Sequence, residues 1–132
     1  MAHATGSFEV KIAPQPDDFL KGSMMGRMSI DKQFHGDIDG TSKGEMLTGG
    51  DVAKGSAGYV AIEQVTGSLN GRSGSFILQH NGTMTRGTPQ LTVSVVPDSG
   101  TGQLAGLSGT MTIKITDGKH FYDFAYTLPE AH

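Results

Sequence analysis

The chain contains the stretch TGSLNGRSGSFIL at residues 66–78 and repeats it without gaps as TGQLAGLSGTMTI at residues 101–113. Both copies fit the pattern T-G-x-L-x-G-x-S-G-[ST], and a weaker third copy, GDIDGTS, occupies residues 36–42. We interpret each copy as the exit of one strand, a turn that places a Leu or Ile under the end of a barrel, and the start of a new strand. The glycines permit the bends and the close backbone approach that such a unit requires.

Apolar and polar residues alternate along most of the chain, which indicates half-buried β-strands. Met111, Ile113 and Ile115, for example, alternate with threonines and a lysine. The pattern predicts eight strands, at about residues 5–12, 25–35, 42–49, 58–66, 73–85, 90–96, 108–116 and 119–128. The best helical candidate is a short turn at residues 16–21.

Short segments rich in Gly, Asn and Asp connect these strands, at residues 49–51, 70–71, 86–89, 98–100 and 117–118. These residues tolerate the positive φ angles of tight hairpin turns, so consecutive strands are expected to be antiparallel. An up-and-down sheet without covering helices hides its edges best by closing on itself. The sequence therefore predicts an all-β fold with one domain over residues 1–132, a single eight-stranded antiparallel barrel. The interior of a barrel of this size is filled by side chains or holds one small ligand.

Composition excludes several classes of function. The 132 residues (13.8 kDa) include 20 glycines and no cysteine, so disulfides, thiolate metal sites and thiol nucleophiles are absent. The formal charge of −3 and the lack of a basic stripe argue against nucleic-acid and membrane partners. Neither an apolar run of about 20 residues nor a secretion signal is recognisable, which favours a cytoplasmic protein.

Two motifs resemble binding sites for a metal or a cofactor, but each lacks a feature that such a site requires. His35, Asp37 and Asp39 share one strand parity, but an EF-hand does not begin with His, and Glu45 falls one position short of the required twelfth. A solvated acidic turn explains them better. Residues 100–105, GTGQLA, mimic a dinucleotide-binding motif but lead into a strand instead of a helix. We therefore expect neither a metal nor a cofactor.

Alignment of the repeat copies assigns the inner face of the strands. It places Phe76, Leu78 and His80 level with Met111, Ile113 and Ile115, and it places Lys32 level with Glu63. The inner face therefore carries three polar residues, Lys32, Glu63 and His80. Because removing a charge from water is costly, such residues are expected to be paired.

These residues allow two interpretations. Glu63 and His80 in a cavity could transfer protons as catalytic groups, since burial and neighbouring charges tune pKa values. The candidate ligand-binding set is then Lys32, Glu63, Gln79, His80 and Tyr122. Alternatively, Lys32 and Glu63 form a buried ion pair that His80 helps to satisfy.

Four segments together resemble a known family: FHGDIDG at 34–40, EQVTG at 63–67, GRSGSFILQH at 71–80 and VVPDSGTGQLAGL at 95–107. The family comprises small bacterial proteins known only as a domain of unknown function. Its fold is similar to the allene-oxide-cyclase-like, or calycin-like, β-barrel. The resemblance implies an eight-stranded antiparallel barrel and carries no activity, because the chain contains no catalytic motif that could be transferred.

Three hypotheses on function follow. The first is a binding protein that holds a small, largely apolar ligand inside the barrel, because the inner face combines polar anchors with apolar residues. These apolar residues are Met28, Phe76, Leu78, Tyr122 and Phe124. The second is an isomerase or cyclase that uses Glu63 or His80 as acid or base. The third is a structural or interaction protein that works as a homo-oligomer through Val60 and Ile62, which lie opposite the inner face.

Overall fold

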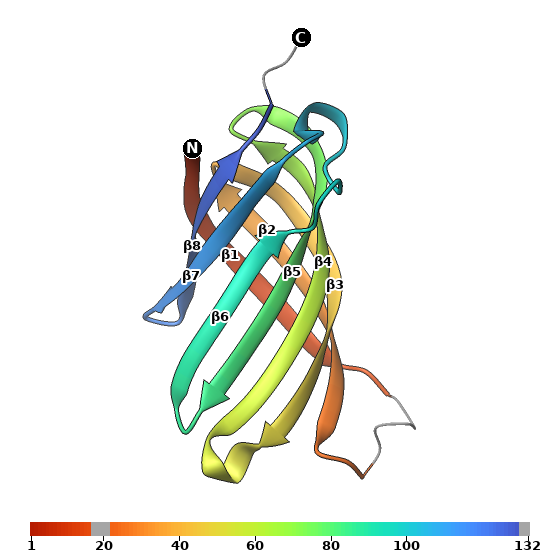
Figure 1. The fold of residues 1–132 in the computed structure, drawn as a ribbon, viewed down its shortest axis with the longest axis vertical. Helices are drawn as coiled ribbons and strands as arrows, with labels where there is room; N and C mark the ends of the chain where they lie inside the picture. Colours follow the sequence, from red (N-terminus) through yellow and green to blue (C-terminus); the bar gives the residue numbers. More distant parts are fainter. Residues whose placement is uncertain (17–21, 130–132) are drawn as a thin grey trace.

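The protein is described by a computed structural model that covers residues 1–16 and 22–129. Over these residues the chain forms a closed antiparallel barrel in which every strand pairs with its neighbours in chain order and β8 returns to β1 (Figure 1). The strands are β1 (Ala2–Pro14), β2 (Met25–Gly36), β3 (Ile38–Asp51), β4 (Ser56–Leu69), β5 (Arg72–Thr85), β6 (Thr88–Val95), β7 (Ser108–Thr116) and β8 (Lys119–Thr127). Two short 3-10 turns, η1 (Val52–Lys54) and η2 (Gly102–Leu104), interrupt the connections.

The predicted eight-stranded antiparallel barrel is therefore confirmed, and every predicted strand corresponds to an observed one. The main difference is length, since β1 and β3 extend further than their hydrophobic alternation indicates. The turn expected at residues 16–21 lies, apart from Pro16, outside the described residues. Within the described part of the chain, no helix is long and apolar enough to cross a membrane.

The repeat builds one end of the barrel. The first copy forms the β4–β5 hairpin, in which Asn70 and Gly71 have positive φ angles of 48° and 85°, as a two-residue hairpin turn requires. The second copy forms η2 and the approach to β7. The two copies bind each other, because the Ser75 amide donates to the Thr101 hydroxyl at 3.0 Å. The apolar residue of each of the three copies is only 1% exposed; these residues are Leu69, Leu104 and Ile38.

The barrel interior consists of two halves. The half near the β4–β5 turn, at the top of Figure 1, is filled by a core that includes Phe34, Phe76 and Phe124. We call it the filled half. Toward the β5–β6 turn, at the bottom of the figure, inner-facing side chains remain exposed, with values of 40% for Met84 and 43% for Leu91. We call this the open half.

Incomplete pairing of β6 with β7 contributes to the open half. In these described strands, pairing is confined to Val93 with Met111 and Ser94 with Thr110. Residues 88–92 of β6 and 112–116 of β7 do not pair with each other, and we call this unpaired stretch the seam. Ile115 has the inner-face parity that the sequence predicts, but it lies beside the seam and is 65% exposed.

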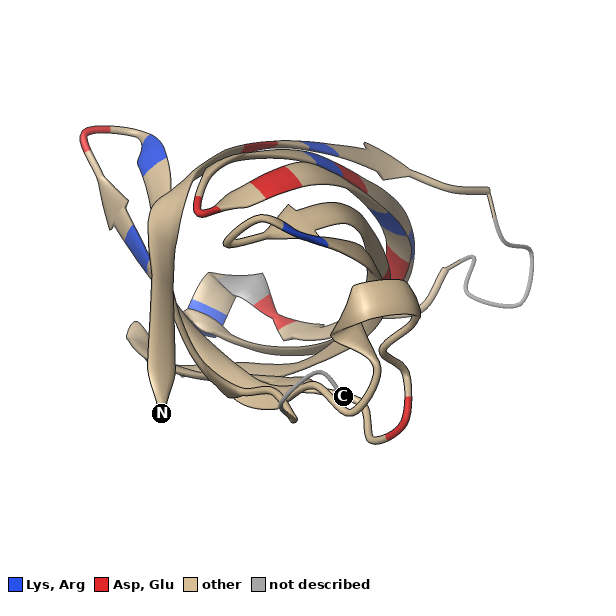
Figure 2. Ribbon diagram, turned by 90° about the horizontal axis from the view of Figure 1, so that it is seen from above, with Lys and Arg blue, Asp and Glu red and all other residues tan. Residues whose placement is uncertain are grey.

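Charged residues lie around the wall of the barrel. Seen from above, Lys and Arg are interspersed with Asp and Glu (Figure 2). This view therefore shows no face that carries a single sign of charge, as the composition indicates.

Candidate functional site

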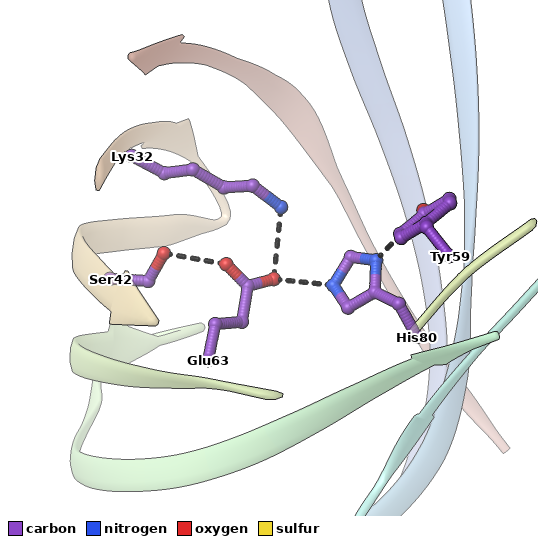
Figure 3. Close-up of polar contacts among 5 residues, drawn as sticks. All are labelled: Lys32, Ser42, Tyr59, Glu63 and His80. Atoms are coloured by element: carbon purple, nitrogen blue, oxygen red, sulfur yellow. Dashed lines mark hydrogen bonds and ion pairs between the residues drawn. The ribbon is translucent and has the colours of Figure 1, made fainter. Parts of the chain in front are cut away.

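The three predicted inner polar residues meet inside the barrel (Figure 3). Glu63 on β4 accepts hydrogen bonds at its Oε1 atom from Lys32 Nζ at 2.9 Å and from His80 Nε2 at 2.8 Å. Its Oε2 atom accepts one from the Ser42 hydroxyl at 2.7 Å. We call Lys32, Ser42, Glu63 and His80 the buried cluster.

Strand register brings the cluster together. Lys32 on β2 lies directly opposite Ser42 on β3, and His80 on β5 lies opposite Ala61, two residues before Glu63 on β4. Residues two apart on a strand face the same side, so all four side chains enter the interior. The cluster therefore spans four adjacent strands.

Glycine at position 44 permits this arrangement. Gly44 lies opposite Glu63 in the β3–β4 ladder. A Cβ atom on Gly44 would overlap the Ile62 carbonyl oxygen and would lie 2.6 Å from the Glu63 Cα. The absence of a side chain lets β3 and β4 approach closely beside the carboxylate.

The cluster holds Glu63 in its ionised form. The Glu63 side chain is completely buried, and burial alone would raise its pKa. The hydrogen bond to His80 and the positive charge of Lys32 outweigh burial and lower the pKa to about 2. The Lys32 ammonium also lies 4.6 Å from the ring centroid of Phe8 and 5.7 Å from that of Phe34. The ion pair is thus desolvated but well partnered.

Tyr59 connects the cluster to the open half. Its hydroxyl lies 3.4 Å from His80 Nδ1, on the side of the imidazole opposite Glu63 (Figure 3). Burial and, to a lesser degree, the negative charge of Glu63 raise the pKa of Tyr59, so the phenol is neutral at physiological pH. Sequence analysis missed Tyr59 and Ser42 as members of the site. Their strand parity was the available signal, since Tyr59 precedes Glu63 by four residues on the same face.

A cavity of about 300 Å³ occupies the open half, between β3, β4, β5 and β6. Its wall includes Met46, Tyr59, Met84 and Leu91, and no residue of the wall is charged. The Tyr59 ring packs over Gly82, its cross-strand partner, where a Cβ atom would overlap the ring. Tyr59 lines the cavity, whereas His80 and Glu63 lie behind it.

Two predicted site residues lie elsewhere. Gln79 precedes His80 and so faces the opposite side of β5, where it lines an outer groove beside Val60 and Ile62. Tyr122 lies in the filled half, where its hydroxyl accepts a hydrogen bond from the Ile38 amide and donates one to the His35 carbonyl, both at 2.9 Å. Gln79 is adjacent to His80 in the sequence and Tyr122 has the inner-face parity, but neither residue belongs to the buried cluster.

The acidic turn is held by contacts within the protein. Asp37 accepts a hydrogen bond from the Thr5 amide at 2.9 Å, and His35 contacts Glu9 at 2.7 Å. Among the described residues, no group of three potential metal ligands comes together.

The fold and the interior site define a small antiparallel β-barrel with a buried ionic cluster and one open half. The chain belongs to the family described as "Protein of unknown function (DUF3224)", which matches residues 4–126. One solved crystal structure is of a protein of unknown function from this family, from Shewanella oneidensis MR-1. Its sequence is 50% identical to that of the chain. That similarity covers 99% of both chains with a TM-score of 0.92. No protein with a curated description matches the chain. The predicted membership of a family of unknown function is thus confirmed.

Proposed function

We propose that the open half of the barrel binds a small, largely apolar ligand. The observation that carries this proposal is the set of inner-facing apolar side chains, Met84 and Leu91 among them, that remain exposed around an uncharged cavity. A volume of about 300 Å³ accommodates about ten non-hydrogen atoms, at about 30 Å³ each. This volume lies at the lower end of ligand pockets in proteins.

The location of this cavity refines the hypothesis drawn from sequence. Phe76, Leu78, Tyr122 and Phe124, which that hypothesis places around the ligand, pack in the filled half instead. The ligand would therefore contact the wall around Met46, Met84 and Leu91, with the buried cluster behind Tyr59.

A matched pair of leucine variants tests ligand binding. Leu91 faces the cavity and is 43% exposed, whereas Leu47 lies on the outer face of β3 and is 51% exposed. We expect the neutral fluorophore naphthalene, whose ten carbon atoms match the cavity volume, to bind the unmodified protein saturably with one site. Leu91→Asp should weaken binding by about tenfold or more, because a ligand would desolvate the new carboxylate, and Leu47→Asp should not. Absence of saturable binding, or an equal effect of both variants, would refute the proposal.

We also propose that the protein self-associates through its outer face. Leu47, Val60 and Ile62 are each about half exposed and line an outer groove of about 550 Å³, whose lining also includes Arg27 and Glu45. Arg27 and Glu45 contact each other at 3.4 Å within one chain. A twofold contact would place each of them near its opposite charge on a second copy, which makes the groove self-complementary.

The same two variants test self-association, but here Leu47→Asp is the disrupting variant and Leu91→Asp is the control. Light scattering across a concentration series should show an oligomer for the unmodified protein and for Leu91→Asp. Leu47→Asp should be a monomer, because it places a charge in the apolar contact. A monomeric unmodified protein at high micromolar concentration would contradict self-association and leave ligand binding unaffected.

An isomerase or cyclase that uses Glu63 or His80 directly has weaker support. Glu63 is fully buried with both oxygens engaged, and His80 is 4% exposed. Any proton exchange with a ligand would have to pass through Tyr59, the member of the chain of hydrogen bonds that lines the cavity.

A further inference from the structure

The side of β7 that borders the seam is unpaired, and we call it the β7 edge. Beyond Met111, β7 pairs with β8 on one side but with no described strand on the other. Thr116 and Lys119 flank the two-residue turn between β7 and β8, and residues that flank such a turn bond to each other. Because backbone groups alternate in direction along a strand, Ile113 and Ile115 direct their N–H and C=O groups toward the seam.

The β7 edge is a template for one more strand. An unpaired edge offers N–H and C=O groups to an extended chain, which is the basis of peptide recognition by strand addition. The edge of β6 across the seam is a poorer template. By the same alternation from the β5–β6 turn, Pro89 and Leu91 face the seam, but proline has no N–H to donate. An added strand therefore pairs best with β7.

The inner side chains of the β7 edge favour apolar residues at alternate positions of the added strand. Ile113 is partly buried against the core of the filled half, whereas Ile115 has the same parity and is 65% exposed. Side chains that face each other across two paired strands contact one another, and β-branched residues pack well in such pairs. Apolar residues opposite Ile113 and Ile115 would therefore cover apolar surface that the barrel leaves in water.

The outer side chain between these two isoleucines favours an acidic residue. Lys114 is exposed, and it forms no ion pair with any residue that the structure describes. Its cross-strand partner on β8 is the uncharged Phe121, and the nearby Asp123 carboxylate contacts His3 at 2.8 Å. Opposite charges on directly facing residues of two strands stabilise the pair, and like charges destabilise it. A carboxylate opposite Lys114 would complement its charge.

A second copy of the chain is a poorer partner for this edge. A twofold contact that sets Ile113 opposite Ile115 also sets Lys114 opposite the same lysine of the second copy, which brings two like charges together. Lysines on edge strands commonly prevent self-pairing of this kind. The same charge does not hinder an acidic segment.

We propose that the β7 edge binds an extended segment of a partner protein in which an acidic residue lies between two apolar residues. The segment adds to β7 as a strand, with its apolar residues opposite Ile113 and Ile115 and its acidic residue opposite Lys114. This inference is independent of the proposed ligand-binding function, because none of the described residues that line the cavity belongs to β7.

A fluorescently labelled peptide, Thr-Val-Glu-Val-Thr with blocked ends, tests strand addition by fluorescence anisotropy. We expect saturable binding with a Kd below about 1 mM. N-methylation of both valines removes the N–H groups that face β7 and should weaken binding about tenfold or more. N-methylation of the glutamate and the last threonine alters groups that face away from β7. This matched peptide should bind within about twofold of the unmodified one.

A charge exchange between protein and peptide tests the role of Lys114. The unmodified protein should bind the glutamate peptide about fivefold more tightly than Thr-Val-Lys-Val-Thr, the value of one favourable cross-strand pair. Lys114→Glu should reverse this order. Lys43→Glu is the matched control, because Lys43 is 86% exposed on β3, which pairs with a strand on each side. It should keep the preference for the glutamate peptide.

Hydrogen exchange locates the bound peptide. It should slow exchange of the Ile113 and Ile115 amides about tenfold and leave the Lys114 amide, which already faces β8, unchanged.

Three results would overturn the proposal: no saturable binding of the glutamate peptide, equal effects of the two methylation patterns, or a preference that survives Lys114→Glu. Protection of Ile113 and Ile115 that rises with the concentration of the protein alone would also overturn it, because a second copy would then occupy the edge. None of these results affects the naphthalene test, so the two proposals can fail separately.

Discussion

Glu63 joins β4 to three other strands inside the barrel, because its two carboxylate oxygens accept hydrogen bonds from β2, β3 and β5. A buried carboxylate is costly in itself, and its partners offset that cost only while all of them are present. The Lys32 ammonium provides the balancing charge. The cluster therefore stabilises the barrel as a unit, and the loss of one member affects the others.

Removal of the lysine charge should be strongly destabilising. Lys32→Met keeps a long apolar side chain against Phe8 but removes the ammonium that pairs with the buried Glu63 carboxylate. We expect a loss of about 3–5 kcal/mol in the free energy of unfolding, measured by denaturant titration. Lys43→Met on β3 is the control, since the Lys43 side chain is 86% exposed with its ammonium 3.9 Å from Asp31, and it should cost about 1 kcal/mol or less. Equal stability of the two variants would contradict a structural role of the cluster.

The ionisation of Glu63 should appear in the pH dependence of stability. Its pKa is about 2 in the folded protein against an ordinary value of 4.5. Because the folded pKa is depressed, the stabilisation is complete above pH 4.5 and is lost as the pH falls from 4.5 toward 2. This difference corresponds to about 3 kcal/mol. Thermal unfolding of the unmodified protein and Glu63→Gln between pH 6 and 2 should show the additional slope only in the former; parallel profiles would contradict it.

At the residue scale, the sequence predicts the inner polar residues where a charged or polar side chain occupies a position with inner-face parity. Lys32, Glu63 and His80 were identifiable because charged or polar residues are rare on an inner face. Ser42 and Tyr59 have the same parity but do not stand out in the sequence, because neutral polar residues are common on both faces of strands. Gln79 was misplaced because adjacent residues on a strand point to opposite sides.

At the scale of strands, the glycines of the barrel have two distinct roles. Some permit turns, as Gly71 does with its φ angle of 85°. Others permit close approach of two strands, as Gly44 does beside Glu63. The repeat revealed the first role from sequence, because turn glycines recur at fixed offsets. The second role depends on the distance between paired backbones, which a single strand does not encode.

Alanine at Gly44 should therefore be far more harmful than alanine at a permissive strand glycine. A Cβ atom on Gly44 would overlap the backbone of β4, whereas one on Gly58 would meet its nearest atom, the Gly82 carbonyl oxygen, at 3.7 Å. We expect Gly44→Ala to lower the free energy of unfolding by about 2 kcal/mol or more and Gly58→Ala to be within about 0.5 kcal/mol of neutral. Chemical denaturation of the two variants measures both values. Similar values would show that β3 and β4 can separate without cost.

At the scale of the whole molecule, the repeat contributes buried side chains to the filled half but gives no information about the open half. The buried Leu69, Leu104 and Ile38 come from the repeat copies, as the sequence predicts for residues placed under the end of a barrel. The open half depends on where β6 and β7 stop pairing. Hydrophobic alternation continues through Ile113 and Ile115 beside the seam, so the sequence pattern gives no sign that the pairing ends at Met111.

Hydrogen exchange should detect the seam as the least protected part of the wall. Backbone amides in residues 88–92 and 112–116 that face across the seam have no partner strand there, whereas Val93 and Met111 are paired. We expect them to exchange about tenfold faster or more than amides of the β4–β5 ladder, which is continuous from Ala57–Met84 to Leu69–Arg72. Bound naphthalene should slow exchange in residues 88–92, because Leu91 belongs to the cavity wall. Uniform protection around the barrel would show instead that β6 and β7 pair along their full length in solution.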